Sequence, residues 1–433
     1  MAKTYNSYKD SGVEWIGEIP EGWEVLALKR IFKIIAGATP KSENEAYWDG
    51  DIAWITPADY KTEQKYVSFG RRNLSEQGYH ACSTVLLPKG SIVFSKRAPI
   101  GLVAITEREL CTNQGCLGCV PIRDVSNVFM YYLLSVYTEQ FELYGSGTTF
   151  KEISANNFAN FKLMLPPLSE QQSIASFLDT KCGEIDYLIS LQEEMISELQ
   201  AYKQSVITEA VTKGLDPNAK MKDSGVEWIG EIPENWKVSK VGLQYNVILG
   251  KMLCPKQLND DYTLEKYYCA ANVHFNGIEG ELKKMWFSSL DKETYLTKKG
   301  DLLVVEGGAG AGGCAIVNDD ESPVYIQNSI MIVRPKLIND VRYLRYQIEQ
   351  FVKRGYIDVV CNKATIPHFT KDKVSNMQIP LPSFEVQQQI ANYLDDKTSQ
   401  IDSLISLKQQ KIDELKSYKK SIIYEYVTGK KRV

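Results

Sequence analysis

Residues 170–213 read EQQSIASFLDTKCGEIDYLISLQEEMISELQAYKQSVITEAVTK, with no proline and a single glycine at Gly183. Apolar side chains recur in this segment at three- and four-residue steps: Ile185, Leu188, Met195, Leu199, Tyr202 and Val206. This spacing predicts one apolar stripe along a long helix. A helix of about 35 residues is roughly 50 Å long, and it needs a partner for its stripe because propensity alone rarely stabilises it in water.

The partner helix is predicted in the same chain. Residues 385–430 read EVQQQIANYLDDKTSQIDSLISLKQQKIDELKSYKKSIIYEYVTGK and align with the first segment at a constant offset of 216 (401 − 185). Because each helix leaves its own globular region, the connectivity predicts an antiparallel pair. The residues expected to pack the helices together or against partners are Ile185, Leu188, Leu199, Tyr202, Ile401, Leu404, Leu415 and Tyr418.

The segments that precede the two globular regions are also repeated. KDSGVEWIGEIPEGW at 9–23 returns as KDSGVEWIGEIPENW at 222–236, an offset of 213 (222 − 9). With the two helices, this makes the whole chain a tandem duplication, and internal repetition of this kind predicts pseudo-two-fold symmetry.

The regions between these repeats contain strand-like runs, such as GSIVF at 90–94, and amphipathic helices, such as 128–143. We therefore predict an α/β (α+β) fold with two globular domains of mixed strands and helices, separated by two long antiparallel helices. The expected boundaries are 1–165 for the first domain, 166–215 for the first helix, 216–381 for the second domain and 382–433 for the second helix. The amino-acid sequences of the two domains differ greatly although their flanking segments agree, which favours one scaffold that carries two different surfaces.

Composition limits the class of protein. A chain of 433 residues is too long for a single domain with one hydrophobic core, and an apolar share of 44% is typical of a globular protein. The sequence has no run of about 18 apolar residues and no apolar signal-peptide core, so we expect a cytoplasmic location without a membrane span. Nine irregularly spaced cysteines favour reduced thiols. The net charge of −4 argues against non-specific coating of nucleic acid, although local basic patches stay possible.

Two patterns resemble catalytic or metal-binding motifs. GAGAGG at 308–313 fits a dinucleotide loop, but CAIV at 314–317 reads as a strand rather than the required helix. Cys116 and Cys119 form a lone C-x-x-C without a second ligand pair, which favours buried strand cysteines over zinc. The three histidines are scattered. We therefore expect no catalytic residue and no metal site.

Loops with small residues, lysines and hydroxyls recur at matching places in both domains, which favours a binding role. KGSIVFSKRAPIGLVAI at 89–105 mirrors KGDLLVVEGGAGAGGCAI at 299–316, with a basic loop in the first copy only. Lysine and arginine there suit phosphate oxygens or a guanine edge. The residues expected to bind DNA are Thr39, Lys41, Ser42, Lys96, Arg97, Thr148, Thr149, Lys151, Lys251, Lys256, Lys363 and Thr365.

The motifs together resemble the specificity subunits of Type I restriction-modification systems. The matching features are YWDGDIAWI at 47–55, RAPIG at 97–101, TNQG at 112–115, LPPLSEQQ at 165–172 and GDLLVVEGG at 300–308. The resemblance implies a non-catalytic chain with two target recognition domains, each of which reads one half of a bipartite DNA target. It also implies two methylation subunits that use S-adenosylmethionine and restriction subunits that use ATP and magnesium, so this chain itself needs no cofactor.

Unlike domains on a stiff helical spacer predict a non-palindromic target whose half-sites lie about one helical turn, roughly 34 Å, apart. Two alternatives stay open at this point. One is a protein scaffold that does not bind DNA and uses its coiled-coil arm to join other proteins. The other is an oxidoreductase that binds NAD or flavin at the glycine loop.

Overall fold

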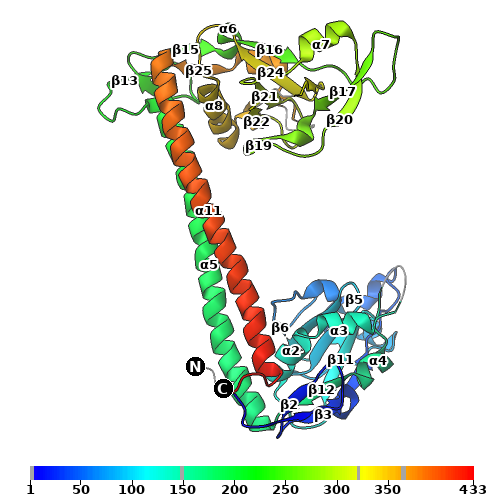
Figure 1. Cartoon of the computed structure of the whole chain (residues 1–433). Coiled ribbons are helices and arrows are strands. Elements are labelled where there is room, and N and C mark those ends of the chain that lie inside the picture. Colours follow the sequence, from blue (N-terminus) through cyan, green and yellow to red (C-terminus); the bar gives the residue numbers. More distant parts are fainter. Residues whose placement is uncertain (1–3, 147–150, 319–321, 362–366) are drawn as a thin grey trace. The chain divides into compact units, whose positions relative to one another are not determined.

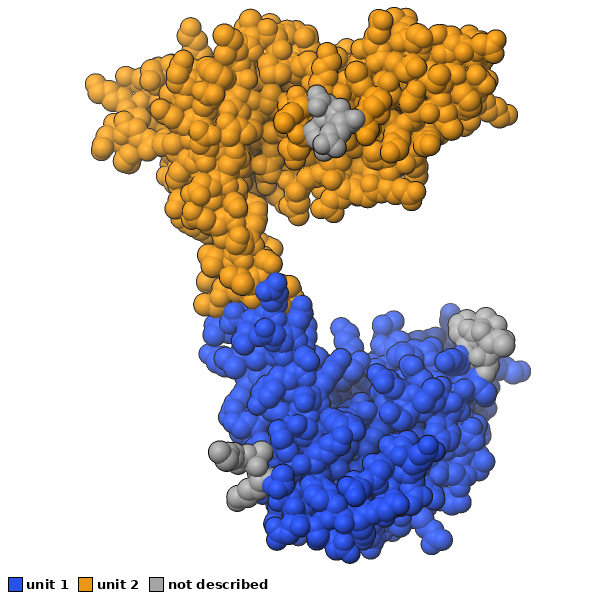
Figure 2. Space-filling view, in the orientation of Figure 1, with its two compact units in different colours: residues 1–192, 410–433 blue, residues 193–409 orange. Residues whose placement is uncertain are grey.

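A computed structural model describes residues 4–146, 151–318, 322–361 and 367–433. The chain divides into two compact units (Figure 2). Unit 1 comprises Met1–Gln192 and Gln410–Val433, and unit 2 comprises Glu193–Gln409. Each unit therefore combines one globular domain with a section of both long helices.

Domain 1 is built from short strands and short helices (Figure 1). Its strands are β1 (Tyr8–Asp10), β2 (Glu18–Pro20), β3 (Glu24–Ala27), β4 (Phe32–Ala36), β5 (Trp48–Ile55), β6 (Tyr66–Val67), β7 (Arg72–Leu74), β8 (Ile92–Lys96), β9 (Ile100–Thr106), β10 (Cys111–Thr112), β11 (Cys116–Pro121) and β12 (Lys162–Leu165). Its α-helices are α1 (Glu76–His80), α2 (Asn127–Ser135), α3 (Thr138–Leu143) and α4 (Ala155–Asn160), and its 3-10 helices are Leu28–Arg30, Glu45–Tyr47 and Pro57–Asp59. The main sheet has the order β4-β11-β8-β9-β6, and a smaller sheet has the order β10-β5-β7.

Domain 2 repeats this plan (Figure 1). Its strands are β13 (Met221–Asp223), β14 (Glu231–Pro233), β15 (Lys237–Lys240), β16 (Tyr245–Leu249), β17 (Thr263–Tyr268), β18 (Val273–His274), β19 (Gly277–Ile278), β20 (Lys283–Phe287), β21 (Leu302–Val305), β22 (Cys314–Ile316), β23 (Tyr325–Ile326), β24 (Ile330–Pro335) and β25 (Gln378–Leu381). Its α-helices are α6 (Val241–Gln244), α7 (Ser289–Tyr295), α8 (Val341–Lys353), α9 (Tyr356–Val360) and α10 (Lys371–Asn376).

The sheets of the two domains correspond in most of their strands, although β6 of domain 1 has no counterpart in the main sheet of domain 2. The order β16-β24-β21-β22 matches β4-β11-β8-β9, and β23-β17-β20 matches β10-β5-β7. Even the parallel pairing of β10 with β5 is repeated by β23 with β17. The duplication predicted from the flanking segments therefore extends through the two globular domains, although their amino-acid sequences have diverged.

Each long helix begins just after a proline and ends at a glycine. Helix α5 spans Leu168–Lys213 and helix α11 spans Phe384–Val427. Proline cannot continue a helix but suits its start, and Gly214 and Gly429, with φ of 78° and 72°, take the left-handed conformation that terminates helices. The Cβ of a larger residue at Gly429 would lie 2.5 Å from Pro20 Cδ, so this position also needs the absence of a side chain.

Helices α5 and α11 run antiparallel within each unit. In unit 1 the Nζ of Lys419 lies 2.6 Å from Asp186 Oδ1, and in unit 2 the Nζ of Lys203 lies 2.7 Å from Asp402 Oδ2. The two ion pairs are equivalent in the duplicated sequence, because the offset of 216 relates Asp186 to Asp402 and Lys203 to Lys419. Additional contacts join Phe177 to Tyr426 in unit 1 and Met195 to Lys408 in unit 2. The numbers rise on one helix as they fall on the other, as the connectivity predicted.

The eight residues expected on the packing stripe fall into three groups. Ile185 and Ile401 are buried, and Leu199 and Leu415 are half-buried. The other four, Leu188, Tyr202, Leu404 and Tyr418, are 43–58% exposed. A pair of helices buries only a narrow seam, so half of a broad apolar stripe stays on the outside.

The glycine-rich loop at 308–313 joins two antiparallel strands, β21 and β22, and no helix follows it. This confirms the predicted strand-loop-strand and removes the helix N-terminus on which a dinucleotide would rest. Gly308 and Gly312 have φ of 89° and 81°, and a Cβ at Gly312 would lie 2.6 Å from Val352. The glycines therefore serve the turn and the close packing of the loop on α8.

Candidate nucleic-acid interface

Four loops of domain 1, distant in sequence, meet where strands β4, β8 and β11 of the main sheet begin or end. We define loop cluster 1 as residues 37–39, 96–97, 112–115 and 151–152. The backbone N–H of Lys96 donates to Gly115 O at 2.9 Å, and that of Ile153 donates to Lys96 O at 3.0 Å. Gly37 packs so closely that its Cβ, if present, would lie 2.2 Å from Asn113 O. Backbone contacts thus hold the four loops together.

Two cations share one carboxylate in loop cluster 1. Lys96 Nζ lies 2.7 Å from Glu152 Oε1, and Arg97 Nη1 lies 3.2 Å from Glu152 Oε2. The hydrogen bond from Lys96 and the nearby positive charges lower the pKa of Glu152, so the carboxylate is ionised at neutral pH. The three groups carry a net charge of +1. The arrangement holds both cations in place and leaves positive charge to attract a phosphate or a guanine edge.

Amide and hydroxyl side chains lie beside these cations. The hydroxyl of Thr39 bonds to Gln114 Oε1, and Asn113 Oδ1 accepts from the backbone N–H of Gly115 at 2.9 Å. Gln114 is exposed. Asparagine and glutamine amides can form two hydrogen bonds with the N6 and N7 of adenine. The cluster therefore combines groups for backbone contact with groups for base readout.

Domain 2 assembles the equivalent loops in the same way. We define loop cluster 2 as residues 250–251, 306–307, 327–329 and 367–369. The backbone N–H of Glu306 donates to Ser329 O at 2.8 Å, and that of Phe369 donates to Glu306 O at 2.6 Å. Gly250 corresponds to Gly37, because its Cβ, if present, would lie 2.5 Å from Gln327 O. The same hydrogen bonds thus recur, and the two clusters share one backbone design.

The side chains of loop cluster 2 reverse the charge pattern. The strand registers and the isolated β-bridges show which positions correspond. Glu306 occupies the position of Lys96, and His368 occupies the position of Glu152. His368 Nδ1 lies 3.2 Å from Glu306 Oε2. This pair carries a net charge of −1 while the imidazole is neutral, against +1 at the matching place in domain 1.

Lys251 is the predicted binding cation that lies in loop cluster 2, and it is neutralised by a local partner. Its Nζ lies 2.7 Å from Asp291 Oδ2 and 5.3 Å from the ring centroid of Tyr262. Burial acts to lower the pKa of Lys251, but the hydrogen bond and the charge of Asp291 outweigh it and raise that pKa above its ordinary value. Loop cluster 2 is therefore not a basic patch.

The structure brings five of the twelve predicted DNA-binding residues into the two clusters: Thr39, Lys96, Arg97, Lys151 and Lys251. Lys151 is exposed beside Glu152, and Lys41, Ser42 and Lys256 are exposed further along the flanking loops. Thr148, Thr149, Lys363 and Thr365 lie outside the described residues.

Sequence reasoning missed five members of the clusters: Gln114, Glu152, Gln327, Asn328 and His368. The sequence does carry a signal for the amides, because TNQGC at 112–116 and IQNSI at 326–330 each place two adjacent amide side chains just before a strand of the main sheet. The partnership of Glu152 with Lys96 had no such signal, since it joins positions 56 residues apart (152 − 96).

Neither a metal centre nor a membrane-spanning helix is found within the described ranges. No group of three or more potential ligands from histidine, cysteine, aspartate and glutamate is placed to hold a metal ion there. Cys116 and Cys119 are buried in β11, as predicted, and burial raises the pKa of the Cys116 thiol to about 12. No helix of the part that the structure describes is long and apolar enough to cross a membrane.

Comparison with known protein families adds an independent observation. Residues 20–201 and 233–417 both match the family described as "Type I restriction modification DNA specificity domain". The chain belongs to this family. It is thus a type I specificity subunit, in which two domains each recognise one part of a DNA target.

Two archaeal relatives of this specificity subunit come from Methanocaldococcus jannaschii. The MjaIX specificity subunit is 27% identical over 86% of both chains, and the MjaVIII specificity subunit is 24% identical over 96% of this chain and 94% of the relative. Both are specificity subunits of type I restriction enzymes.

Solved structures show the same fold at lower sequence identity. A chain from a study of assembly and conformational transition of the type I R-M system has a TM-score of 0.72 at 18% identity and covers 94% of this chain and 98% of its own. The HsdS subunit from Thermoanaerobacter tengcongensis has a TM-score of 0.55, also at 18% identity, and covers 95% and 98%. These likenesses agree with the predicted mixed domains and long helices.

Proposed function

We propose that loop clusters 1 and 2 are the base-reading surfaces of this specificity subunit. The observation that carries the proposal is the assembly, at the same place in both domains, of charged and amide side chains from segments far apart in sequence. Such side chains supply both the phosphate contacts that position a protein on DNA and the base contacts that specify a sequence. Because their charges differ, the two half-sites should differ in sequence and the target should not be a palindrome.

We further propose that the exposed faces of α5 and α11 dock two methylation subunits. Large side chains stay exposed along both helices, including Tyr187, Leu188, Tyr202, Leu404, Leu407 and Tyr418. Exposed apolar groups along one element favour a protein partner. S-adenosylmethionine would be bound by the methylation subunits, and ATP and magnesium by restriction subunits, so this chain would contribute recognition rather than catalysis. We infer a cytoplasmic location from this role.

The test compares two arginine variants of the full chain, each combined with its methylation subunits. Arg97→Ala removes a member of loop cluster 1. Arg123→Ala removes an arginine of similar exposure, 42% against 37%, that pairs with Glu24 at 3.7 Å and lies in neither cluster. Sequencing of modified bases across a host genome measures the target and the extent of methylation.

Arg97→Ala is expected to relax one position of the first half-site, or to reduce methylation about tenfold, because a good base contact contributes about 1–3 kcal/mol of discrimination. The second half-site should keep its sequence, and Arg123→Ala should match the wild type. An unchanged target and extent in Arg97→Ala would remove loop cluster 1 from the interface. Absence of sequence-selective binding in every form would favour the protein scaffold instead.

A further inference from the structure

One helix of each domain is tied to a long helix by two hydrogen bonds that recur in both domains. In domain 1, the backbone N–H of Ser126, which caps α2, donates to Gln171 Oε1 on α5 at 2.9 Å. Further along, the hydroxyl of Tyr132 donates to Asp179 Oδ1 at 2.7 Å. Gln171 is itself fixed, because its Nε2 donates to Pro166 O at 2.8 Å.

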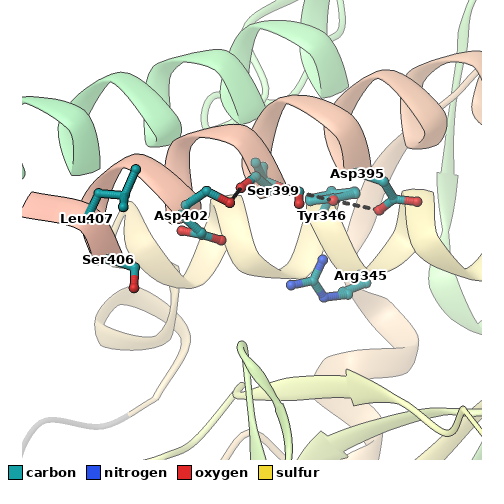
Figure 3. Close-up of a pocket in the computed structure, with 9 residues that line it drawn as sticks. Arg345, Tyr346, Asp395, Ser399, Asp402, Ser406 and Leu407 are labelled. Carbon is teal, nitrogen blue, oxygen red and sulfur yellow. Dashed lines mark hydrogen bonds between the residues drawn. The ribbon is translucent and has the colours of Figure 1, made fainter. Parts of the chain in front are cut away.

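Domain 2 repeats both ties with the same atoms. The backbone N–H of Asp340, which caps α8, donates to Gln387 Oε1 on α11 at 3.0 Å, and Gln387 Nε2 donates to Pro382 O at 3.0 Å. The hydroxyl of Tyr346 donates to Asp395 Oδ1 at 2.7 Å (Figure 3). The glutamines and the aspartates are each 216 positions apart (387 − 171 and 395 − 179), so the ties belong to the duplicated scaffold.

Each aspartate also meets a cation, but the cation comes from a different element in each domain. Asp179 pairs with Lys65, in the loop before β6, whereas Asp395 Oδ2 accepts from Arg342 Nη1 on α8 at 2.8 Å. The tyrosine is therefore the partner that the two domains share. Tyr132 and Tyr346 are only 3% and 1% exposed, while both aspartates stay about two-fifths exposed.

Two hydrogen bonds between the domain helix and the long helix fix the angle between the two helices, whereas a single hydrogen bond would let one helix rotate about it. On each long helix the two tied residues are eight positions apart, which corresponds to about 12 Å along the axis. Between them lie the buried pairs Ile174 and Leu178 on α5, and Ile390 and Leu394 on α11. Apolar contacts are non-directional and tolerate small rotations, but a hydrogen bond requires its distance and angle. The tyrosine-aspartate bond thus resists rotation of the domain helix on the long helix in both domains, and in domain 2 Arg342 on α8 adds hydrogen bonds to Asn392 and Asp395 of α11.

The phenols are suited to this role because they stay protonated. Burial, and then the hydrogen bond to Asp179, raise the pKa of Tyr132 far above its ordinary value. Burial raises the pKa of Tyr346 to about 12, although Thr398 acts in the opposite direction. Both hydroxyls therefore donate to the aspartates at any physiological pH.

We propose that Tyr132 with Asp179, and Tyr346 with Asp395, are positioning residues that fix the orientation of each recognition domain on its long helix. In this way they set how many base pairs the protein accepts between the two half-sites. The inference rests on the proposed function, since it assumes that both loop clusters read DNA. It assigns to these residues the spacing of the target rather than the identity of its bases.

The test uses the full chain with its methylation subunits and a DNA library in which the wild-type half-sites are separated by spacers of different lengths. Tyr132→Phe and Tyr346→Phe each remove one hydroxyl and keep the buried ring. The matched control is Tyr245→Phe, because the hydroxyl of Tyr245 is buried in domain 2 and makes no hydrogen bond in the part of the chain that the structure describes. Thermal denaturation confirms that each variant is folded.

Each of the two variants is expected to lower the preference for the cognate spacer over spacers one base pair longer or shorter by about tenfold, equivalent to about 1.4 kcal/mol. The half-site sequences should stay unchanged, and Tyr245→Phe should behave as the wild type. Equal loss of methylation at all spacers, or an unchanged preference in both variants, would overturn the positioning role. Failure of the wild type to methylate any bipartite site would instead contradict the proposed function.

Discussion

Loop cluster 1 and loop cluster 2 share a backbone and differ in charge. In the first, Lys96 and Arg97 surround Glu152, whereas in the second, Glu306 lies beside His368 at the matching positions. The hydrogen bonds that hold the loops together involve backbone atoms in both. Because the frame does not depend on the side chains it displays, the charge of the surface can reverse while the fold stays the same.

The largest expected effect comes from breaking the equivalence of the two long helices. We expect deletion of residues 193–196 from α5 alone to abolish methylation of the native target, because it shifts one helix by about 6 Å against the other and separates ion pairs such as Lys203 with Asp402. Deletion of 193–196 together with 409–412, the equivalent residues of α11, should restore register and methylate a target with a different spacer. Sequencing of modified bases distinguishes these results, and a matched deletion that kept the original spacing would contradict a spacing role for the helices.

A medium effect should follow from the difference in charge between the clusters. Lys96→Met is expected to weaken DNA binding about tenfold at physiological salt and to reduce the slope of log K against log salt by about 0.9, if one phosphate contact is lost. Glu306→Gln removes a negative charge at the equivalent position, so it should bind DNA as tightly as the wild type or more tightly.

Titration of binding against salt concentration, with the complete methylation complex, measures both variants. Equal weakening by both substitutions would mean that the charge reversal between the clusters has no consequence for DNA affinity. A reduced slope for Glu306→Gln would also count against the comparison.

The smallest effect concerns two carboxylates whose pKa values shift in opposite directions. The hydrogen bond from Lys96 lowers the pKa of Glu152, so the pair stabilises the fold above the ordinary pKa and this contribution is lost as the pH falls through the lowered value. Burial raises the pKa of Glu349 on α8, despite Arg345 at 3.5 Å, so ionisation of Glu349 destabilises the fold as the pH rises through the ordinary value toward the raised one.

Glu152→Gln should therefore lower the free energy of unfolding at pH 7 by about 0.5 kcal/mol, because a partly exposed pair contributes little. Glu349→Gln should raise it at pH 7, on the order of 1 kcal/mol, by removing a buried charge whose Oε2 atom has no hydrogen-bond partner among the described residues. The difference for Glu349→Gln should vanish below the ordinary pKa of that carboxylate, where it is protonated in both the folded and the unfolded chain, and the difference for Glu152→Gln should fade as the pH falls through its lowered pKa. Calorimetry at pH 7 and pH 3 checks the signs, and shifts of the same sign at pH 7 would refute this account.

The periodic and repeated features could be predicted from the sequence. The long helices, their antiparallel course and the strand-loop-strand at 308–313 follow from apolar spacing, from the duplication and from connectivity. The buried seam could not be read from one stripe, because Leu188 and Leu404 have the same spacing as the buried Ile185 and Ile401 and yet stay exposed. Only the contact between the helices determines which side of a broad stripe is covered.

The candidate site could be predicted only in part. Lys96 and Arg97 were found because a basic loop is visible in the sequence, and the basic loop is absent from the second copy. Glu152 and His368 were missed because their roles arise from loops that meet in space and not in the chain. A local pattern reports the residue types in a loop, but the partner of a charge depends on tertiary contacts.

The division between repeated and divergent segments has a consequence for how such chains can change. Gln171, Asp179, Gln387 and Asp395 lie in the duplicated helices, whereas both loop clusters lie in the divergent middles. An exchange of one middle segment between two related genes would replace a recognition surface and keep the residues of the long helix to which that domain is attached. A lineage could therefore acquire a new DNA target in a single recombination event, without any intermediate that has lost its fold.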